Sequence, residues 1–289
     1  MGNAEEAGNA EEAGHDTVVD NIAPPPAYSE AGAPTTSQSQ EESVTPSDIK
    51  PTSQINQQFP PYFNAYYQWK FTKTFHLGQS KDHPLYAVRT HTGWSGTPGI
   101  VLHNGPSDKD PPLAAAGDEN SWSKHSTIIL PPLPGSDAES STEFMRTNVS
   151  WKTVSYPFTI EVGHGRNVRR EDFEWRKSRG GEIKELDKHS RGWKLVRLRA
   201  NAEGSGGERS ARSHGATSDG KEIVAVWTWH SGWSMTKSFK FQFLGSALTG
   251  EMGERWSVMA VITALRMWYL HFAGVSSSGA ANGVTVVTG

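Results

Sequence analysis

The stretch from Gly253 to Gly274 reads GERWSVMAVITALRMWYLHFAG and is the longest apolar run of the 289-residue chain. Neither proline nor glycine occurs between Trp256 and Ala273, so no residue there interrupts a helix. Glu254 stands at the expected start, where the helix dipole favours an acid, and Gly274 stands where a glycine often ends a helix. The stretch therefore predicts an α-helix.

The apolar residues of this predicted helix point in all directions and do not form one stripe. Such a helix is either surrounded by protein or placed in a membrane. The residues from Trp256 to Phe272 span roughly 26 Å, which is short for a bilayer. Arg266 within the hydrocarbon would cost about 2.5–3.5 kcal/mol. We therefore favour a helix at the centre of a domain over a membrane anchor or a helix in the membrane interface.

The composition divides the chain into three parts. Residues 1–58 contain few large apolar side chains and are rich in Ala, Glu, Ser and Pro, which is typical of disorder. All eleven Trp and all eleven Phe lie from Phe59 onward. We expect a disordered acidic tail over 1–58, one folded domain over 59–275 and a flexible C-terminal tail over 276–289.

The folded part shows strand patterns of period two. They lie at Tyr66–Leu77, Pro84–His91, Gly99–His103, Ser126–Leu130, Met145–Lys152, Tyr156–Gly163, Gly192–Ala200, Glu222–His230 and Lys237–Gly245. A further hairpin, DFEWRKSR-GG-EIKELDK, is expected to turn at Gly180-Gly181. Residues 104–124 and 131–142 are polar enough to be loops.

A helix that is apolar on every side needs apolar contacts on every side. A closed sheet supplies them and also removes exposed strand edges. We therefore predict a mainly β fold, a closed antiparallel β-barrel of about twelve strands around a central hydrophobic C-terminal α-helix.

This order of strands, with DFEWRKSRGGEIKEL and GWKLVRL ahead of the helix, resembles the Tubby C-terminal-like superfamily. That group includes the LURP-one-related and phospholipid-scramblase families, and the chain looks most like a fungal member. The resemblance covers about Phe59 to Ala273 and implies a twelve-stranded barrel around a helix. Tubby domains bind phosphatidylinositol bisphosphate, and scramblase relatives carry Pro-rich tails with PPxY motifs. The chain has no acidic loop like the calcium loop of the scramblases.

The tail contains a PPxY motif at Pro25, Pro26 and Tyr28. Prolines pre-form the extended helix that WW domains bind in an aromatic groove. The motif predicts a WW-domain partner, for example a HECT-type ubiquitin ligase. The alternative is a Pro-rich spacer.

The charge is unevenly distributed. Residues 1–50 hold ten acids against Lys50 alone, a net charge of −9, so the remainder carries +6. The stretch from Arg166 to Arg199 holds twelve basic residues against six acids. Such a surface attracts anions, and arginine offers forked donors to phosphate. The candidate residues for binding anionic phospholipid headgroups are Arg166, Arg169, Arg170 and Arg179.

Two other interpretations of the basic stretch are open. It can be a solvated sheet face with cross-strand ion pairs. It can also bind nucleic acid if Trp175 and Trp193 stack on bases, but these side chains are expected to face the core, so no nucleic-acid partner is predicted.

Signatures of catalysis are missing from the sequence. There is no GxSxG, HExxH or P-loop, and the eleven histidines have no metal-ligand spacing. The phrase His-x-Gly-Trp-Ser recurs at His91 and His230, as expected of a repeated turn whose Trp covers the end of a barrel.

We therefore expect a monomeric, non-enzymatic adaptor without metal or cofactor. The alternative is a scramblase-like protein anchored in a membrane by the C-terminal helix. The absence of cysteine and the polar N-terminus favour a cytoplasmic location, at most peripheral at the cytoplasmic face of membranes.

Overall fold

The computed structural model describes residues 49–52, 55, 57–67, 73–91, 98–118, 125–133, 136–151, 153–188, 191–201, 215–229 and 239–272. The PPxY motif and the segment 276–289 lie outside these residues. The strands are β1 (Tyr62–Tyr67), β2 (Thr74–Gly78), β3 (Tyr86–Thr90), β4 (Ile100–His103), β5 (Pro112–Asp118), β6 (Ser126–Leu130), β7 (Ser141–Met145), β8 (Asn148–Val149), β9 (Val154–Val162), β10 (Arg169–Ser178), β11 (Gly192–Asn201), β12 (Lys221–Thr228) and β13 (Lys240–Phe243). The α-helices are α1 (Gly181–Leu186) and α2 (Glu254–Phe272).

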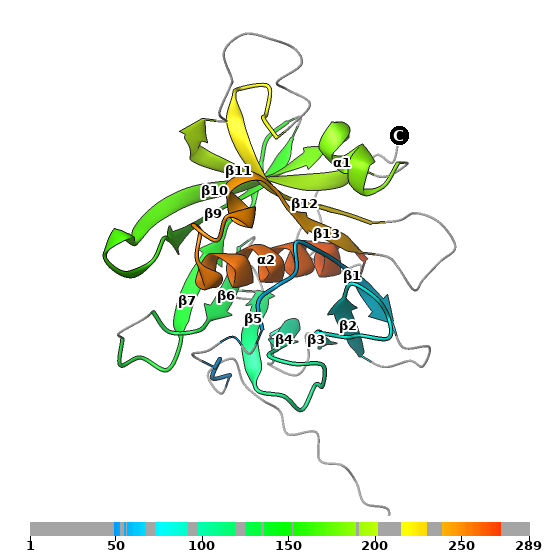
Figure 1. Cartoon of the computed structure of the whole chain (residues 1–289), viewed down its shortest axis with the longest axis vertical. Coiled ribbons are helices and arrows are strands. Elements are labelled where there is room, and N and C mark those ends of the chain that lie inside the picture. The colour runs from blue at the N-terminus through cyan, green and yellow to red at the C-terminus, as the bar shows by residue number, and fades with distance from the viewer. Residues whose placement is uncertain are drawn as a thin grey trace, which may run out of the picture. The chain divides into compact units, whose positions relative to one another are not determined.

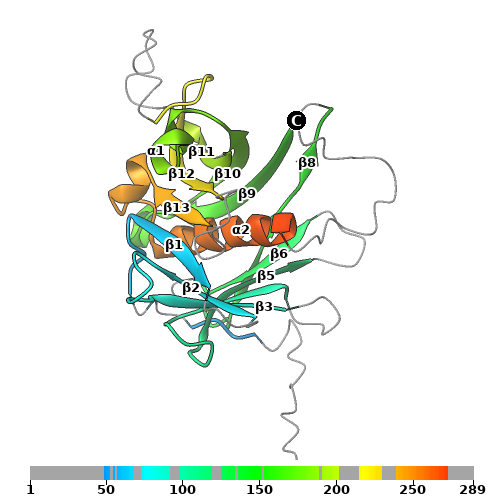
Figure 2. The ribbon, with the colours of Figure 1, turned by 90° about the vertical axis from the view of Figure 1, so that its right-hand side faces the viewer.

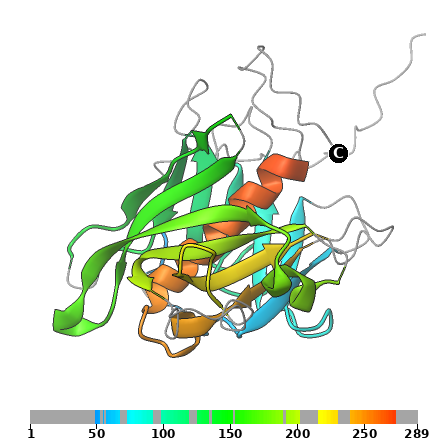
Figure 3. The same cartoon turned by 90° about the horizontal axis from the view of Figure 1, so that it is seen from above.

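The described strands form one 13-stranded antiparallel sheet in the order β7-β6-β5-β4-β3-β2-β1-β13-β12-β11-β10-β9-β8. Almost every strand pairs with its neighbour in the sequence, and β1 pairs with β13. Figure 1 shows α2 running between the two halves of this sheet, and Figure 3 shows strands on both sides of the helix from a second direction.

The sheet does not close into a continuous barrel, so this part of the prediction is corrected. Its two edges are β7 and β8. They are successive parts of one chain segment, because only Arg146 and Thr147 separate Met145 from Asn148. The Arg146 N–H donates to the Pro157 carbonyl at 2.9 Å, but no ladder joins β7 to β9 in the described part of the chain. Side-chain ion pairs occupy this seam.

The predicted central helix is confirmed. In α2, every side chain from Val258 to Met267 is buried. Rings from several strands pack against it: the ring of Trp268 lies 5.1 Å from that of Phe75, and the ring of Trp256 lies 5.7 Å from that of Phe173. Among the described residues, no helix is both long and apolar enough to cross a membrane.

Arg266 is the one charged residue in the middle of α2, and protein covers it. Its side chain is 1% exposed, pairs with the carboxylate of Asp118 and donates from Nε to Ser126 Oγ at 3.1 Å. A Cβ at Gly99 would come within 2.9 Å of its guanidinium, so a larger residue there would require Arg266 to shift. A buried charge needs such partners, and they fix the rotation of the helix.

Strand β5 corrects the prediction that 104–124 is a loop. Leu113 and the alanines at 114, 115 and 116 are fully buried. β5 lies against α2. Small side chains let a helix approach a sheet closely, and a run of alanines carries no strand signal in the sequence.

Two other predicted boundaries change. The single strand expected over Tyr66–Leu77 is divided between β1 and β2, which pair with each other. The prediction of a tight turn at Gly180-Gly181 is wrong, because Gly181–Leu186 forms the helix α1. The strand that pairs with β10 is β11, which follows this helix. Ile183 of α1 packs on Ile223 and Val226, with Leu186 against the same cluster. The two apolar residues of EIKEL therefore hold the helix on the outer face of the sheet.

The domain also begins ahead of Phe59. Ile49 is 5% exposed and packs with Val101, Ala115 and Ile129. The segment that leads in from the tail therefore covers the outer face of β4, β5 and β6.

We expect Leu265→Asp to lose roughly 3–5 kcal/mol of unfolding free energy, because an unpaired charge would lie where the side chain is fully buried. A urea titration followed by circular dichroism measures this. The matched control is Ser257→Asp, which introduces the same side chain in the half-buried first turn, where the helix dipole favours an acid. Equal unfolding curves for wild type and Leu265→Asp would contradict a core built on α2.

Candidate functional site

The structure does not bring the four predicted anion-binding arginines together. Arg166 lies in the 3₁₀ turn η2 (Gly165–Asn167), and Arg169 and Arg170 begin β10. Arg179 follows the far end of that ten-residue strand. At ~3.3 Å per residue the two ends are roughly 30 Å apart. These residues therefore belong to opposite ends of the sheet.

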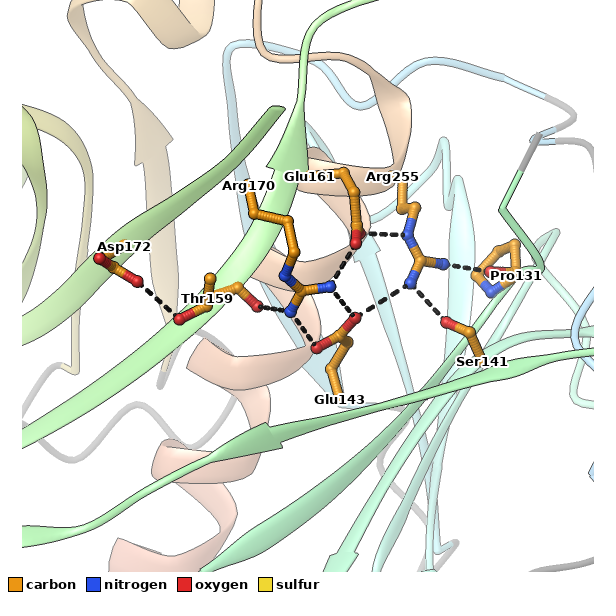
Figure 4. A network of polar contacts seen from close by, with 8 residues as sticks. All are labelled: Pro131, Ser141, Glu143, Thr159, Glu161, Arg170, Asp172 and Arg255. Atoms are coloured by element: carbon orange, nitrogen blue, oxygen red, sulfur yellow. Dashed lines mark hydrogen bonds and ion pairs between the residues drawn. The ribbon is translucent and has the colours of Figure 1, made fainter. Parts of the chain in front are cut away.

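Arg170 belongs to the seam between β7 and β9 (Figure 4). Its guanidinium binds both carboxylate oxygens of Glu143 at 3.0 and 2.8 Å and also bonds Glu161. The hydrogen bonds that Arg170 donates to Glu143 are the main reason that the pKa of Arg170 is raised. A bidentate arginine–carboxylate pair is among the stronger polar contacts in proteins. Arg170 of β10 thus connects the edge strand β7 to β9 across the seam.

Arg255 reaches the same seam from the first turn of α2. Its Nε lies 3.1 Å from Glu161, and its terminal nitrogens bond Ser141 and the Pro131 carbonyl. Figure 4 shows the two arginines on either side of the two acids. We call Glu143, Glu161, Arg170 and Arg255 the seam clasp, because together they join β7 and β9 to each other and to the central helix.

Arg169 is also neutralised within the fold. Its Nε lies 2.6 Å from Glu171, which is 2% exposed and also pairs with Arg197 of β11. Burial pushes the pKa of Glu171 up, but the hydrogen bond and charge of Arg197, with that of Arg169, outweigh burial and hold the pKa below its usual value. Arg197 pairs further with Glu251 at 2.8 Å. This network closes the end of the core where α2 begins.

A group of exposed cations lies at the end of β10 and in its connection to β11. Four exposed cations there have no ion pair among the described residues: Lys177, Arg179, Lys184 and Lys188. We call these four residues the α1 patch.

The acids beside the α1 patch are mostly paired with other cations. Glu182 pairs with Lys194 at 3.2 Å, and Asp187 pairs with Lys240 at 3.2 Å. Of the acids in residues 177–188, this leaves Glu185. The local potential is therefore positive, and an anionic ligand would not have to displace an existing ion pair.

Helix α1 is the element that sequence reasoning missed, and it positions the α1 patch. Ile183 is fully buried, so the helix is held on the sheet while Lys184, the next residue, is exposed. The spacing of Ile183 and Leu186 by three residues was the available signal. The pair Gly180-Gly181 predicts a tight turn instead.

Trp175 and Trp193, the residues that would stack on nucleic-acid bases, pack within the protein. Trp175 is fully buried and donates from Nε1 to Thr263 of α2 at 3.0 Å. Trp193 stacks on Trp227 with ring centroids 6.4 Å apart. The Trp of each His-x-Gly-Trp-Ser phrase, Trp94 and Trp233, lies outside the described residues.

One cavity of about 580 Å³ lies at the start of α2. Its lining includes Phe59, His164, Thr249, Glu251 and Glu254. Two carboxylates make it a poor site for an anion. In the parts of the chain that the structure describes, no group of His, Asp or Glu is arranged to hold a metal ion.

No family model, curated protein or solved structure matches this chain.

The seam clasp gives a stability prediction with a pH dependence. Replacing Arg170 by Met should cost about 1–2 kcal/mol at pH 7, a value discounted because 48% of the Arg170 side chain is exposed. Burial pushes the pKa of Glu161 up, but its hydrogen bonds and the charges of Arg170 and Arg255 hold it below 4.5. A carboxyl group whose pKa is lowered by folding stabilises the folded state at pH values above its unfolded-state pKa. This stabilisation is lost as the pH falls through the folded-state pKa.

The difference in stability between wild type and Arg170→Met should therefore be full at pH 7 and shrink below about pH 4.5. Chemical denaturation at pH 3.5, 4.5 and 7 measures it. Arg166→Met is the matched control, since Arg166 is exposed on the neighbouring turn and should change stability by less than about 0.5 kcal/mol. A difference independent of pH would contradict an ionic seam.

Proposed function

We propose that the protein is a non-enzymatic binding module whose α1 patch contacts anionic phospholipid headgroups and whose tail recruits a WW-domain protein. The observation that carries this proposal is the separation of the basic stretch into paired and unpaired charge. Arg169 and Arg170 have internal counterions, whereas the α1 patch is exposed and has none among the described residues. We therefore assign headgroup binding to the α1 patch and a structural role to the arginines at the start of β10.

The chemistry of the α1 patch fits a membrane surface better than one small ligand. Three of its four cations are lysines, which are flexible point charges and suit a field of headgroups. Each cation near an anionic bilayer contributes about 1 kcal/mol, so four contribute roughly three decades of affinity. The attraction should weaken with salt.

Membership of the Tubby C-terminal-like superfamily is part of this proposal. It is supported by a long antiparallel sheet around a C-terminal helix and by the PPxY motif. We further propose that the seam clasp makes the sheet behave as a closed barrel, and that the protein is a cytoplasmic monomer at the periphery of membranes. A membrane anchor at α2 is less well supported, because inserting the helix would strip it from the strands that bury it.

The α1 patch is tested by reversing the charge of Lys177, Arg179, Lys184 and Lys188 to Glu. We expect this variant to lose at least about three decades of affinity for vesicles that contain phosphatidylserine and phosphoinositide. The control reverses four exposed cations elsewhere, namely Lys81, Lys109, Arg166 and Arg199, and so carries the same net charge.

Cosedimentation at 50 and 300 mM salt separates the two variants. The control should keep most of its affinity, because its cations are spread over the surface. Equal losses in both variants would show that net charge alone drives binding, and full retention by the patch variant would refute the proposal.

The tail is tested separately with a peptide of residues 20–34. It should bind isolated WW domains, and Tyr28→Ala should abolish the binding because the tyrosine is the second anchor. Fluorescence anisotropy measures both. Indistinguishable binding by the two peptides would leave the segment as a spacer.

A further inference from the structure

The most exposed large apolar side chain among the described residues is Trp151, at 93% exposure. It lies at the tip of the hairpin formed by β8 and the start of β9, where Val149 pairs with Val154. Val149 is itself 54% exposed. A single exposed apolar residue is ordinary, but a tryptophan and a valine together at the tip of a projecting hairpin need an explanation.

The tip has a fixed local geometry. The Ser150 N–H donates to the Thr153 carbonyl at 2.9 Å, and the Thr153 N–H donates back to Ser150 Oγ at 3.2 Å. The two hydroxyl oxygens are 2.8 Å apart. These bonds join the residues on either side of the tip, Ser150 and Thr153, to each other. Figure 2 shows β8 and β9 reaching away from the rest of the sheet.

The tip lies at the same end of the sheet as the α1 patch. Ser155 of β9 pairs with Arg176 of β10, so the turn that precedes β9 is next to the residues that follow Arg176. Those residues begin the α1 patch at Lys177. The helix α2 also ends here, since the ring centroid of His271 in its last turn lies 4.7 Å from that of Trp229. Trp229 follows Thr228, which pairs with Gly192, and Gly192 pairs with Ser178. An apolar projection and a group of exposed cations therefore lie at the same end of β9 and β10.

We infer that the β8–β9 tip inserts Trp151 and Val149 into the interfacial layer of an anionic bilayer. This inference rests on the proposed headgroup binding by the α1 patch and adds the mode of attachment. Tryptophan favours the boundary between headgroups and acyl chains because its ring is apolar and its N–H is polar. The positive charge of the α1 patch, at the same end of β9 and β10, is complementary to anionic lipid. A narrow tip can enter a fluid lipid layer without a complementary groove.

A fluorescent label tests insertion directly. The chain contains no cysteine, so Val149→Cys can carry a single environment-sensitive NBD group while Trp151 is kept. We expect its emission to shift to the blue and to be quenched by nitroxide lipids when vesicles contain phosphatidylserine and phosphoinositide, but not with phosphatidylcholine alone. The matched control is a label at Val168→Cys, 45% exposed and at the opposite end of β10, which should not respond.

Affinity provides the second readout. Trp151→Ala should weaken vesicle binding by roughly tenfold, the size typical of an exposed tryptophan anchor, whereas Trp151→Phe should retain most of it. The unfolding curve should not change, because the side chain is exposed.

The outcomes separate this inference from the proposed function. Bound protein without a spectral shift and with full affinity of Trp151→Ala would overturn tip insertion and leave the α1 patch intact. Wild-type protein that binds no anionic vesicle would overturn both. A shift that grows with protein concentration in the absence of vesicles would assign the tip to contact with a second copy of the chain, and would also overturn insertion.

Discussion

The structure depends on the burial of a helix that is apolar on every side. A flat sheet can cover only one side of α2, so the strands have to wrap around it, and the two ends of the sheet have to meet. They meet along the segment from Ser141 to Val149, which serves one edge and then the other. Because no ladder joins β7 to β9 in the described part of the chain, side-chain ion pairs close this seam together with the backbone hydrogen bond from Arg146 to Pro157. Arg255 is decisive, since it extends from the helix itself to the acids of the seam.

The same constraint explains how the basic stretch divides its charge. Along β10, side chains alternate between the core and the outer face, so consecutive arginines meet different partners. Arg169 pairs with buried Glu171, and Arg170 pairs across the seam. The cations after Ser178 lie on a connection that packs on the sheet through Ile183 and Leu186. Arg169 and Arg170 at the start of this strand therefore have structural partners, whereas Lys177 and Arg179 at its end have no ion pair among the described residues. Sequence distance alone does not show this division.

The sequence predicts the central helix because the absence of breakers and the all-round apolar pattern admit few alternatives. It also predicts most strands, since alternation and flanking turns are local signals. It misses β5, because a run of alanines is recognised as a strand only by its packing against α2. It also misses α1, because six residues are too few for a clear helical period of apolar residues. The candidate site was half predictable. The stretch was identified, but the set of Arg166, Arg169, Arg170 and Arg179 spans both ends of β10, and ion pairing between distant strands is not encoded locally.

The separation of charge has a consequence for interpreting any basic-residue variant of this protein. A change at Arg170 or Arg197 removes the partner of a buried carboxylate, so lost binding there would be confounded with lost stability. A change at Lys184 or Lys188 leaves the core and the seam untouched, because each side chain is exposed and has no ion pair among the described residues. Binding and folding can therefore be varied independently at one end of β10 and not at the other. That independence is the physical basis for assigning recognition to the end of the molecule that carries the α1 patch and Trp151.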